Sequence, residues 1–207
     1  MDQMASVLGK AGHTLFLDCR SLEWQHIPLG DASFLICDTR TKHSLAESEY
    51  NTRRAECESA AASLGKRSLR DADIDEVGTL PTALAKRARH VVTENLRVLS
   101  AVEALRSGDL STVGKLMNES HASLRDEFEV SCRELDIMAE ICRSQPEILG
   151  SRMMGGGFGG CTISICDGNA DLHQISARIE AEYARSTTIV PAIYQCTATQ
   201  GALEVSA

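Results

Sequence analysis

The stretch GGGFGG at residues 155–160 places five glycines in six positions, directly before the apolar run CTISIC (161–166). Glycine gives up more backbone freedom on folding than any other residue, so such a cluster is costly to order. The absent side chains also leave space, because a second backbone segment or a ligand can approach closely. We therefore predict a tight loop that contacts another backbone segment or a small molecule and then enters a strand.

This loop partly matches two phosphate-binding sequence patterns, but the residues that follow it exclude both. Gly155, Gly157 and Gly160 fit the spacing G-x-G-x-x-G, but a dinucleotide-binding loop is followed by a helix. Here the β-branched residues of 161–166 predict a strand, so no helix N-terminus is available for a pyrophosphate. A Walker A loop ends in Gly-Lys-Ser/Thr, whereas Gly160 is followed by Cys161.

The overall composition argues against several classes of partner. The chain of 207 residues is 43% apolar and 24% charged, which is ordinary for a globular protein, and its net charge is -8. An acidic chain does not attract nucleic acid or a membrane surface, so we expect neither as a partner. There is no apolar run of the length that a membrane helix needs, and no signal-peptide pattern. The eight cysteines form no C-x-x-C pair, so we expect reduced thiols in a cytoplasmic protein.

Local patterns predict a fold of the α+β class. Apolar runs between turn residues predict strands, and helical apolar spacing or a capping residue predicts helices. Pro191 lies inside the last predicted strand, which indicates an edge position or a bulge. The strands do not alternate regularly with the helices, and this order favours α+β over a parallel α/β fold. The predicted strands cover 12–19, 33–39, 161–166 and 187–197, and the predicted helices cover 45–64, 82–106, 110–124, 134–144 and 172–185.

Five segments of the chain, in the same order, resemble the galactokinase branch of the GHMP small-molecule kinases. One of them is the glycine-rich stretch, which resembles the third signature motif of that family. Five ordered matches are far more specific than any single motif. The segments are MDQMASVLGKAGHTLFLDCRSLE (1–23), KHSLAESEYNTRRAECE (42–58), RARHVVTENLRV (87–98), MNESHASLRDEFEVSCRELD (117–136) and SRMMGGGFGGCTISI (151–165).

The resemblance implies both a fold and an activity. Residues 41–207 are expected to form the GHMP kinase C-terminal domain, a ferredoxin-like sheet with packed helices. Residues 1–40 are expected to be the last strands of the N-terminal catalytic domain. Galactokinases transfer the γ-phosphoryl group of ATP to the anomeric hydroxyl of galactose with the help of Mg²⁺. Galactose and ATP are therefore the implied small-molecule partners.

The resemblance also assigns roles to particular residues. Asp2 takes the position of the catalytic aspartate, and Tyr50 takes that of a tyrosine that contacts the sugar. We expect the ATP phosphates and Mg²⁺ to be held by motifs that precede the Met-Asp-Gln motif, and we assign no metal ligand within this chain. The loop residues expected near ATP and substrate are Gly155, Gly156, Gly157, Gly159 and Gly160.

Several other residues are interpreted as structural. Arg53 and Arg54 are predicted to lie on a solvated helix face, and His90 and His121 are predicted to be hydrogen-bonded packing residues. Met154 stands where the family usually has threonine, and a thioether cannot donate the hydrogen bond of a hydroxyl group. The support of the loop at this position is therefore expected to differ from that in the family.

Three functions stay open from the sequence. The chain resembles the C-terminal part of a galactokinase, and without the phosphate loop and metal ligands we expect it to be inactive by itself. The first alternative is a galactokinase-like sugar sensor that binds its ligands without catalysis. The second is a kinase for a related sugar such as N-acetylgalactosamine. An intact phosphate loop ahead of Met1 would favour a kinase, and a substituted one would favour a sensor.

Overall fold

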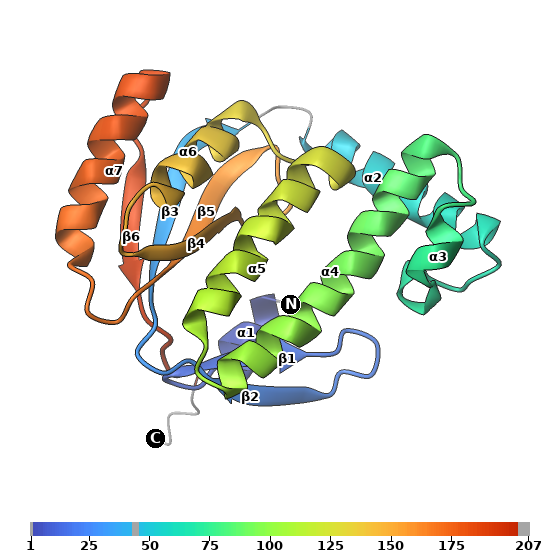
Figure 1. The fold of residues 1–207 in the computed structure, drawn as a ribbon, viewed down its shortest axis with the longest axis horizontal. Helices are drawn as coiled ribbons and strands as arrows, with labels where there is room; N and C mark the ends of the chain where they lie inside the picture. Colours follow the sequence, from blue (N-terminus) through green and yellow to red (C-terminus); the bar gives the residue numbers. More distant parts are fainter. Residues whose placement is uncertain (1, 43–45, 203–207) are drawn as a thin grey trace.

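The structure of the protein is a computed structural model that describes residues 2–42 and 46–202, with the backbone alone described at 2, 42 and 46–48 (Figure 1). The strands are β1 (His13–Leu17), β2 (Trp24–Pro28), β3 (Ser33–Lys42), β4 (Ile148–Met153), β5 (Gly159–Cys166) and β6 (Ala192–Cys196). The helices are α1 (Asp2–Leu8), α2 (Ala46–Ser63), α3 (Ile74–Val77), α4 (Thr82–Arg106), α5 (Leu110–Ser123), α6 (Arg133–Arg143) and α7 (Leu172–Thr187). A 3-10 turn (Leu69–Asp71) precedes α3, and a π-helical turn (Leu124–Phe128) continues α5.

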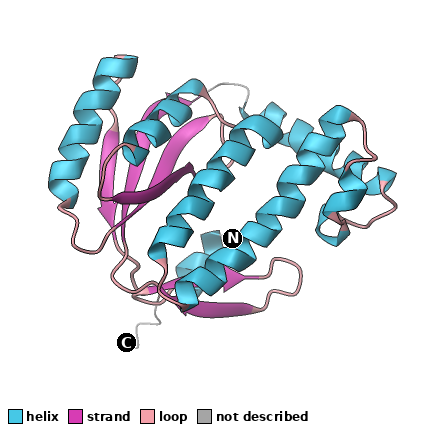
Figure 2. Ribbon diagram, in the orientation of Figure 1, coloured by secondary structure: helices cyan, strands magenta, loops and turns pink. Residues whose placement is uncertain are grey.

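Four strands form one antiparallel sheet in the order β4-β5-β3-β6, and β1 and β2 form a separate hairpin (Figure 2). Along the chain the four strands and the helices between them follow the order β-α-β-β-α-β of a ferredoxin-like unit. The predicted α+β class, with a ferredoxin-like sheet and packed helices, is therefore confirmed. Pro191 directly precedes β6, and β6 lies at the edge of the sheet as its sequence predicts.

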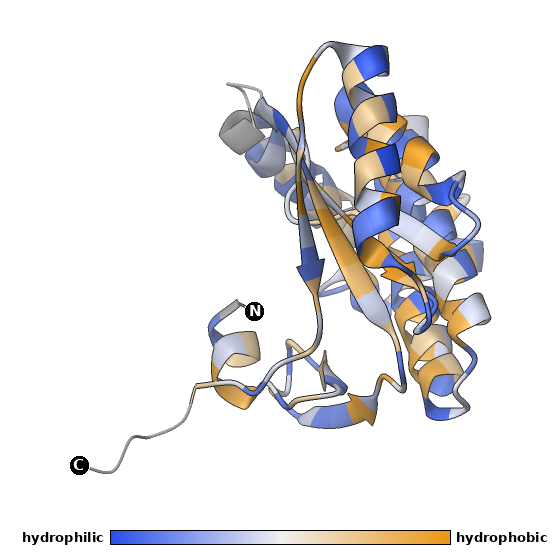
Figure 3. Cartoon of the chain, turned by 90° about the vertical axis from the view of Figure 1, so that its left-hand side faces the viewer, coloured by the Kyte–Doolittle hydropathy of each residue, from blue (hydrophilic) through white to orange (hydrophobic). Residues whose placement is uncertain are grey.

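The main core lies between the sheet and helices α6 and α7, which gather on one side of it (Figures 1 and 3). Leu35 and Cys37 of β3 are fully buried in this core, while Phe34 and Ile36 are half-buried, as expected for a strand with one covered face. Tyr183 is fully buried among them. The residues that α6 and α7 bring to this core include Met138, Ile141, Cys142, Ile175, Ile179 and Tyr183.

Helix α5 lies directly on the backbone of strand β4, and two glycines make this approach possible. A Cβ atom on Gly114 would overlap the carbonyl of Leu149, and one on Gly150 would overlap the carbonyl of Gly114. The side chain of Asn118 then accepts a hydrogen bond from the N–H of Ser151 at 2.9 Å. This contact joins α5 to β4 two residues before the strand ends and the glycine-rich loop begins.

Two strands, β2 and β4, and two short helices, α1 and α3, are not predicted by the sequence. Strand β2 is short and mostly exposed, and β4 contains Gly150, which is typical of turns. Strand β4 forms nevertheless because it pairs with β5 on one side and meets α5 on the other. Helix α3 has only four residues, and it is capped by Asp73 and Glu76 in a reciprocal capping box.

The expected domain boundary at residue 40 falls inside β3. Residues from Ser33 onward pair with β5, and those from Phe34 onward pair with β6. A strand pairs with its neighbours as one unit, so we propose that the boundary between the two domains lies before β3 rather than within it.

Candidate functional site

The glycine-rich stretch forms the connection between the antiparallel strands β4 and β5. The prediction that it enters a strand is confirmed, but the strand that precedes it, β4, was not predicted. Gly155 and Gly157 have φ of 77° and 88°, and Phe158 between glycines has φ of 57°. Residues other than glycine rarely adopt this left-handed backbone conformation, so the conformation of the loop depends on its glycines.

Gly157 lies against the backbone of Val130, in the segment between the π-helical turn and α6. A Cβ atom at this position would overlap the carbonyl oxygen of Val130. The same oxygen accepts a hydrogen bond from the N–H of Phe158 at 2.8 Å. The predicted close approach of a second backbone segment is therefore present.

Beside this contact lies a pocket of about 270 Å³ that brings the loop and helix α2 together. Tyr50 is 57% exposed, and its ring carbon Cδ2 lies 3.9 Å from the position of a Cβ atom on Gly156. The sequence separates these two residues widely, and the structure places them on one pocket wall. The pocket is lined by Tyr50, Arg53, Arg54, Leu124, Phe128, Val130, Gly155 and Gly156.

The other predicted site residues lie on different elements. Gly159 and Gly160 begin β5, where the carbonyl of Gly160 accepts a hydrogen bond from the Thr39 hydroxyl at 2.7 Å. Asp2 begins α1, and its side chain lies outside the described residues. Met154 is 39% exposed, and its N–H donates to the carbonyl of Cys161 at 3.0 Å.

The interpretation of Arg53 as a solvated surface residue is wrong. Its side chain is only 11% exposed, and its guanidinium donates to the carbonyls of Phe128 at 2.7 Å and Glu129 at 3.2 Å. These acceptors lie far along the chain, so no local pattern announces them. Arg54, by contrast, is 72% exposed and pairs with Glu58, as predicted for a solvated helix face.

The two histidines are hydrogen-bonded packing residues, as predicted. Nδ1 of His90 lies 2.9 Å from the hydroxyl oxygen of Ser123, and its ring stacks on Phe128 with centroids 4.5 Å apart. Burial lowers the pKa of His90 to about 4, so the ring is neutral at pH 7. His121 is 1% exposed and accepts a hydrogen bond from the N–H of Met153.

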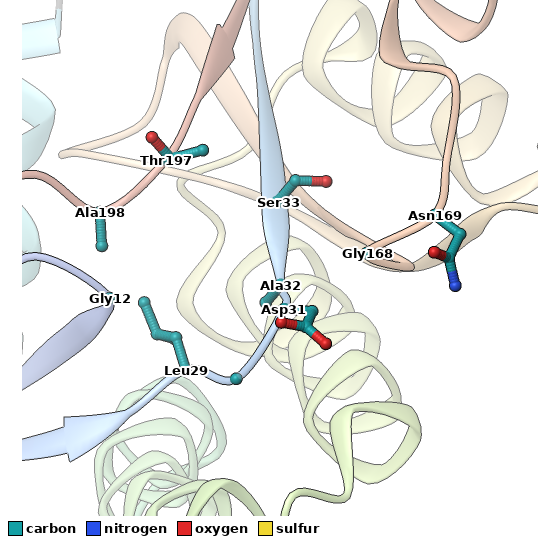
Figure 4. Close-up of a pocket in the computed structure, with 10 residues that line it drawn as sticks. Gly12, Leu29, Asp31, Ala32, Ser33, Gly168, Asn169, Thr197 and Ala198 are labelled. Atoms are coloured by element: carbon teal, nitrogen blue, oxygen red, sulfur yellow. The ribbon is translucent and has the colours of Figure 1, made fainter.

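A second hollow of about 400 Å³ lies at the opposite end of β5 from the glycine-rich loop (Figure 4). Its lining contains a single ionisable side chain, that of Asp31, among small side chains and backbone. The lining residues are Gly12, Leu29, Gly30, Asp31, Ala32, Ser33, Gly168, Asn169, Thr197 and Ala198.

Across residues 2–42 and 46–202, no three His, Cys, Asp or Glu side chains gather as a metal site would require. In the same residues there is no helix long and apolar enough to cross a membrane.

The fold is that of GHMP kinases. Residues 101–185 match the family described as "GHMP kinases C terminal". The L. major mevalonate kinase in complex with R-mevalonate has the same fold, with a TM-score of 0.54 and 20% identity over 92% of this chain and 50% of that one.

Within this family the chain is similar to galactokinases. It is 46% identical to the galactokinase of Homo sapiens over 194 residues, which are 91% of this chain and 49% of the relative. It is 48% identical to that of Thermotoga neapolitana over 165 residues, or 79% and 47% of the two chains. The Lactococcus lactis galactokinase complexed with galactose matches with a TM-score of 0.87 and 32% identity, over 95% of this chain and 53% of that one. The chain thus spans about half the length of the relatives it matches.

Proposed function

We propose that the chain is the C-terminal part of a galactokinase and supplies one wall of the galactose site. The observation that carries this proposal is the pocket shared by Tyr50, Gly155 and Gly156. It belongs to a chain that is 46% identical to human galactokinase and that superposes on a galactokinase crystallised with galactose. The reaction is transfer of the γ-phosphoryl group of ATP to the anomeric hydroxyl of galactose.

The pocket has mostly apolar walls, from Tyr50, Leu124, Phe128 and Val130, with backbone hydrogen-bond donors on the glycine-rich loop. Its volume of about 270 Å³ lies just below the range for small-molecule sites, about 300–1,000 Å³, which favours a monosaccharide over a nucleotide. Within the described residues, the backbone N–H groups of Gly155, Gly156 and Gly157 make no hydrogen bond. These donors and the Tyr50 hydroxyl can bind sugar hydroxyls or phosphate oxygens.

The fit to ATP and Mg²⁺ is partial. The loop offers backbone donors to a phosphate, but the described residues hold no cluster of metal-ligating side chains. ATP, when bound, supplies the phosphoryl group that is transferred. The residues that we assign to this chain's part of the site bind and orient the sugar and exclude solvent from it.

We assign Asp2 the role of proton acceptor for the anomeric hydroxyl. An aspartate with a pKa near ~3.9 is a weak base at neutral pH. Phosphoryl transfer through a loose transition state needs little early deprotonation of the nucleophile. Asp2 would therefore orient the hydroxyl and accept its proton late in the reaction, an assistance typically worth ~10²–10⁴ in rate.

The experiment joins the 207-residue chain to the N-terminal half of human galactokinase and measures galactose 1-phosphate formed from ATP. Asp2→Asn is expected to lower kcat by ~10² or more with a modest change in sugar affinity. Tyr50→Phe is expected to raise the KM for galactose by about tenfold, because one hydrogen bond to the sugar is lost. Unchanged kinetics in both variants would contradict the proposed roles.

The same assay separates the alternatives. Transfer to N-acetylgalactosamine in preference to galactose would identify a kinase for the related sugar. Binding of galactose without transfer, by a fusion that contains an intact phosphate loop, would favour a non-catalytic sensor.

A further inference from the structure

The segment 127–129, of which Phe128 lines the pocket, has an unusual backbone. It leaves the π-helical turn with Glu129 in the left-handed region, at φ 56° and ψ 48°. A residue with a Cβ atom adopts this conformation at a cost of roughly 1–2 kcal/mol. The surroundings must therefore hold the segment in place.

Two arginines from two helices hold its carbonyl groups. Arg53 of α2 donates to the carbonyls of Phe128 and Glu129, at 2.7 and 3.2 Å. Arg87 of α4 donates to the carbonyl of Glu127. Three successive carbonyl oxygens thus accept hydrogen bonds from guanidinium groups, which present several donors in a rigid plane.

The two guanidinium groups are linked to each other by one carboxylate. Oε2 of Glu56 accepts from Nε of Arg87 at 2.7 Å and from Nη1 of Arg53 at 3.1 Å. The carboxylate of Glu129 accepts from Nη2 of Arg87 at 2.7 Å and from Lys86 at 2.9 Å. The hydrogen bond from Arg87 is the main cause that lowers the pKa of Glu129 to about 2, so this carboxylate is charged at neutral pH.

This cluster is connected to the glycine-rich loop through the next residue. Val130 follows Glu129, and its carbonyl accepts from Phe158 while Gly157 lies against it without space for a Cβ atom. A shift of the segment 127–129 would therefore displace Val130 and, with it, the loop. Arg87 itself is 4% exposed and is not among the residues that line the pocket.

We propose that Arg53 and Arg87, joined through Glu56, are positioning residues that set the glycine-rich loop for its ligand. Arg87 acts only through other groups, because its guanidinium is buried away from the pocket. The part of this proposal that concerns the sugar rests on the proposed function. The part that concerns the loop does not, because it can be measured without any ligand.

The first experiment measures hydrogen–deuterium exchange in the 207-residue chain. Arg87→Lys keeps the charge but cannot bridge Glu56, Glu129 and the carbonyl of Glu127 at once. We expect exchange of the hydrogen-bonded loop amides, those of Met154 and Phe158, to become about tenfold faster, with α7 unchanged. The matched control is Arg89→Lys on the same helix, because Arg89 is 45% exposed and pairs at 3.4 Å with the carboxylate of Glu127 rather than with a carbonyl. We expect this control to exchange like the parent chain.

A second variant protects the test against a loss of folding in Arg87→Lys. Glu56→Gln keeps the size of the side chain and one acceptor oxygen, but removes the negative charge that lies between the two guanidinium groups and so weakens both charge-assisted hydrogen bonds. It is expected to accelerate exchange in the same loop. Exchange equal to that of Arg89→Lys in both variants overturns the proposal. Acceleration spread evenly over the loop and α7 also overturns it, because it indicates a general loss of stability.

The second experiment uses the fusion described above. Arg87→Lys should raise the KM for galactose by about tenfold with a smaller change in kcat, because the loop that contacts the sugar is displaced. A merely stabilising residue would lower the amount of active enzyme and leave KM unchanged. If the fusion has no activity with galactose, the proposed function fails, while the exchange experiment still decides whether the arginines position the loop.

Discussion

Nδ1 of His121 accepts a hydrogen bond from the backbone N–H of Met153 at 3.1 Å, and this contact joins helix α5 to the last residue of β4. A nitrogen that accepts cannot carry the proton, so the proton lies on Nε2. Nε2 is 3.2 Å from Oδ1 of Asp136 on α6, although its N–H is not aligned for a strong hydrogen bond. The end of β4, where the glycine-rich loop begins, is thus tied to the helix layer through one buried ring.

Two variants of His121 distinguish the contribution of the contact at Nδ1 from that of the contact at Nε2. Asn carries its amide oxygen near the position of Nδ1, whereas Gln places its polar atoms near Nε2. His121→Gln should lower the free energy of unfolding by about 2 kcal/mol, because a buried N–H of Met153 loses its acceptor. His121→Asn should lower it less. Urea denaturation measures both, and equal losses, or a larger loss for Asn, would show that the contact to Met153 is not the important one.

Gly157 and Gly156 are neighbours whose replacement should have different results. Gly157→Ala should lower the free energy of unfolding by about 3 kcal/mol, because the left-handed backbone is strained and the methyl group overlaps the carbonyl of Val130. Gly156→Ala should change it by less than about 0.5 kcal/mol, because the nearest atom is 3.9 Å away. Thermal unfolding compares the two, and a Gly157→Ala protein as stable as Gly156→Ala would mean that the loop is free to move aside.

The elements that the sequence predicts well have local signals. Helix α4 matches its predicted range of 82–106, and α5 begins after Asp109, which accepts from the N–H of Thr112 as an N-cap. Strand β4 has no such signal, because its partners are β5 and the glycine-lined surface of α5. Its formation depends on tertiary contacts that no window of the sequence contains.

The candidate site likewise contains residues that the sequence predicts and one whose role it does not indicate. The composition predicts the glycine-rich loop, and the resemblance to galactokinases predicts the position of Tyr50. The structure brings both to one pocket. The part played by Arg53 was missed because its acceptor, the carbonyl of Phe128, lies 75 residues away. Every residue has a backbone carbonyl, so the residue type at position 128 gives no sign of this hydrogen bond.

The contact between α5 and β4 gives a third prediction. Gly114→Ala should lower the free energy of unfolding by about 3 kcal/mol, because the methyl group meets the backbone of Leu149 and neither element can move without disturbing the core. The matched control is Gly78→Ala, where φ is -63° and the nearest atom is 3.8 Å away. Alanine at Gly78 should raise stability by about 0.5 kcal/mol by restricting the unfolded chain. Guanidinium denaturation of the two variants should give changes of opposite sign, and a tolerated Gly114→Ala would contradict the close backbone contact.

The last prediction concerns pH and His90, whose ring stacks on Phe128 beside the pocket. Burial is the largest cause that lowers the pKa of His90 from 6.5 to about 4, and Arg97 and Arg152 add to it while Glu94 opposes it. The unfolded chain therefore binds this proton first as the pH falls. The stability that depends on a neutral His90 is complete above about pH 6.5 and is lost as the pH falls toward about 4, by up to about 3 kcal/mol.

Comparison with His90→Gln isolates this contribution from that of the carboxylates, which titrate in both proteins. Gln keeps a polar group for Ser123 but does not titrate. Between pH 7 and pH 4.5 the parent chain should lose about 2 kcal/mol more than the variant, measured by urea denaturation at several pH values. Parallel curves for the two proteins would show that His90 has the same pKa folded and unfolded, and that the ring is open to solvent in solution. Because Phe128 also presents its carbonyl to Arg53, protonation of His90 should at the same time loosen the pocket wall, and exchange in residues 127–130 should rise in the parent alone.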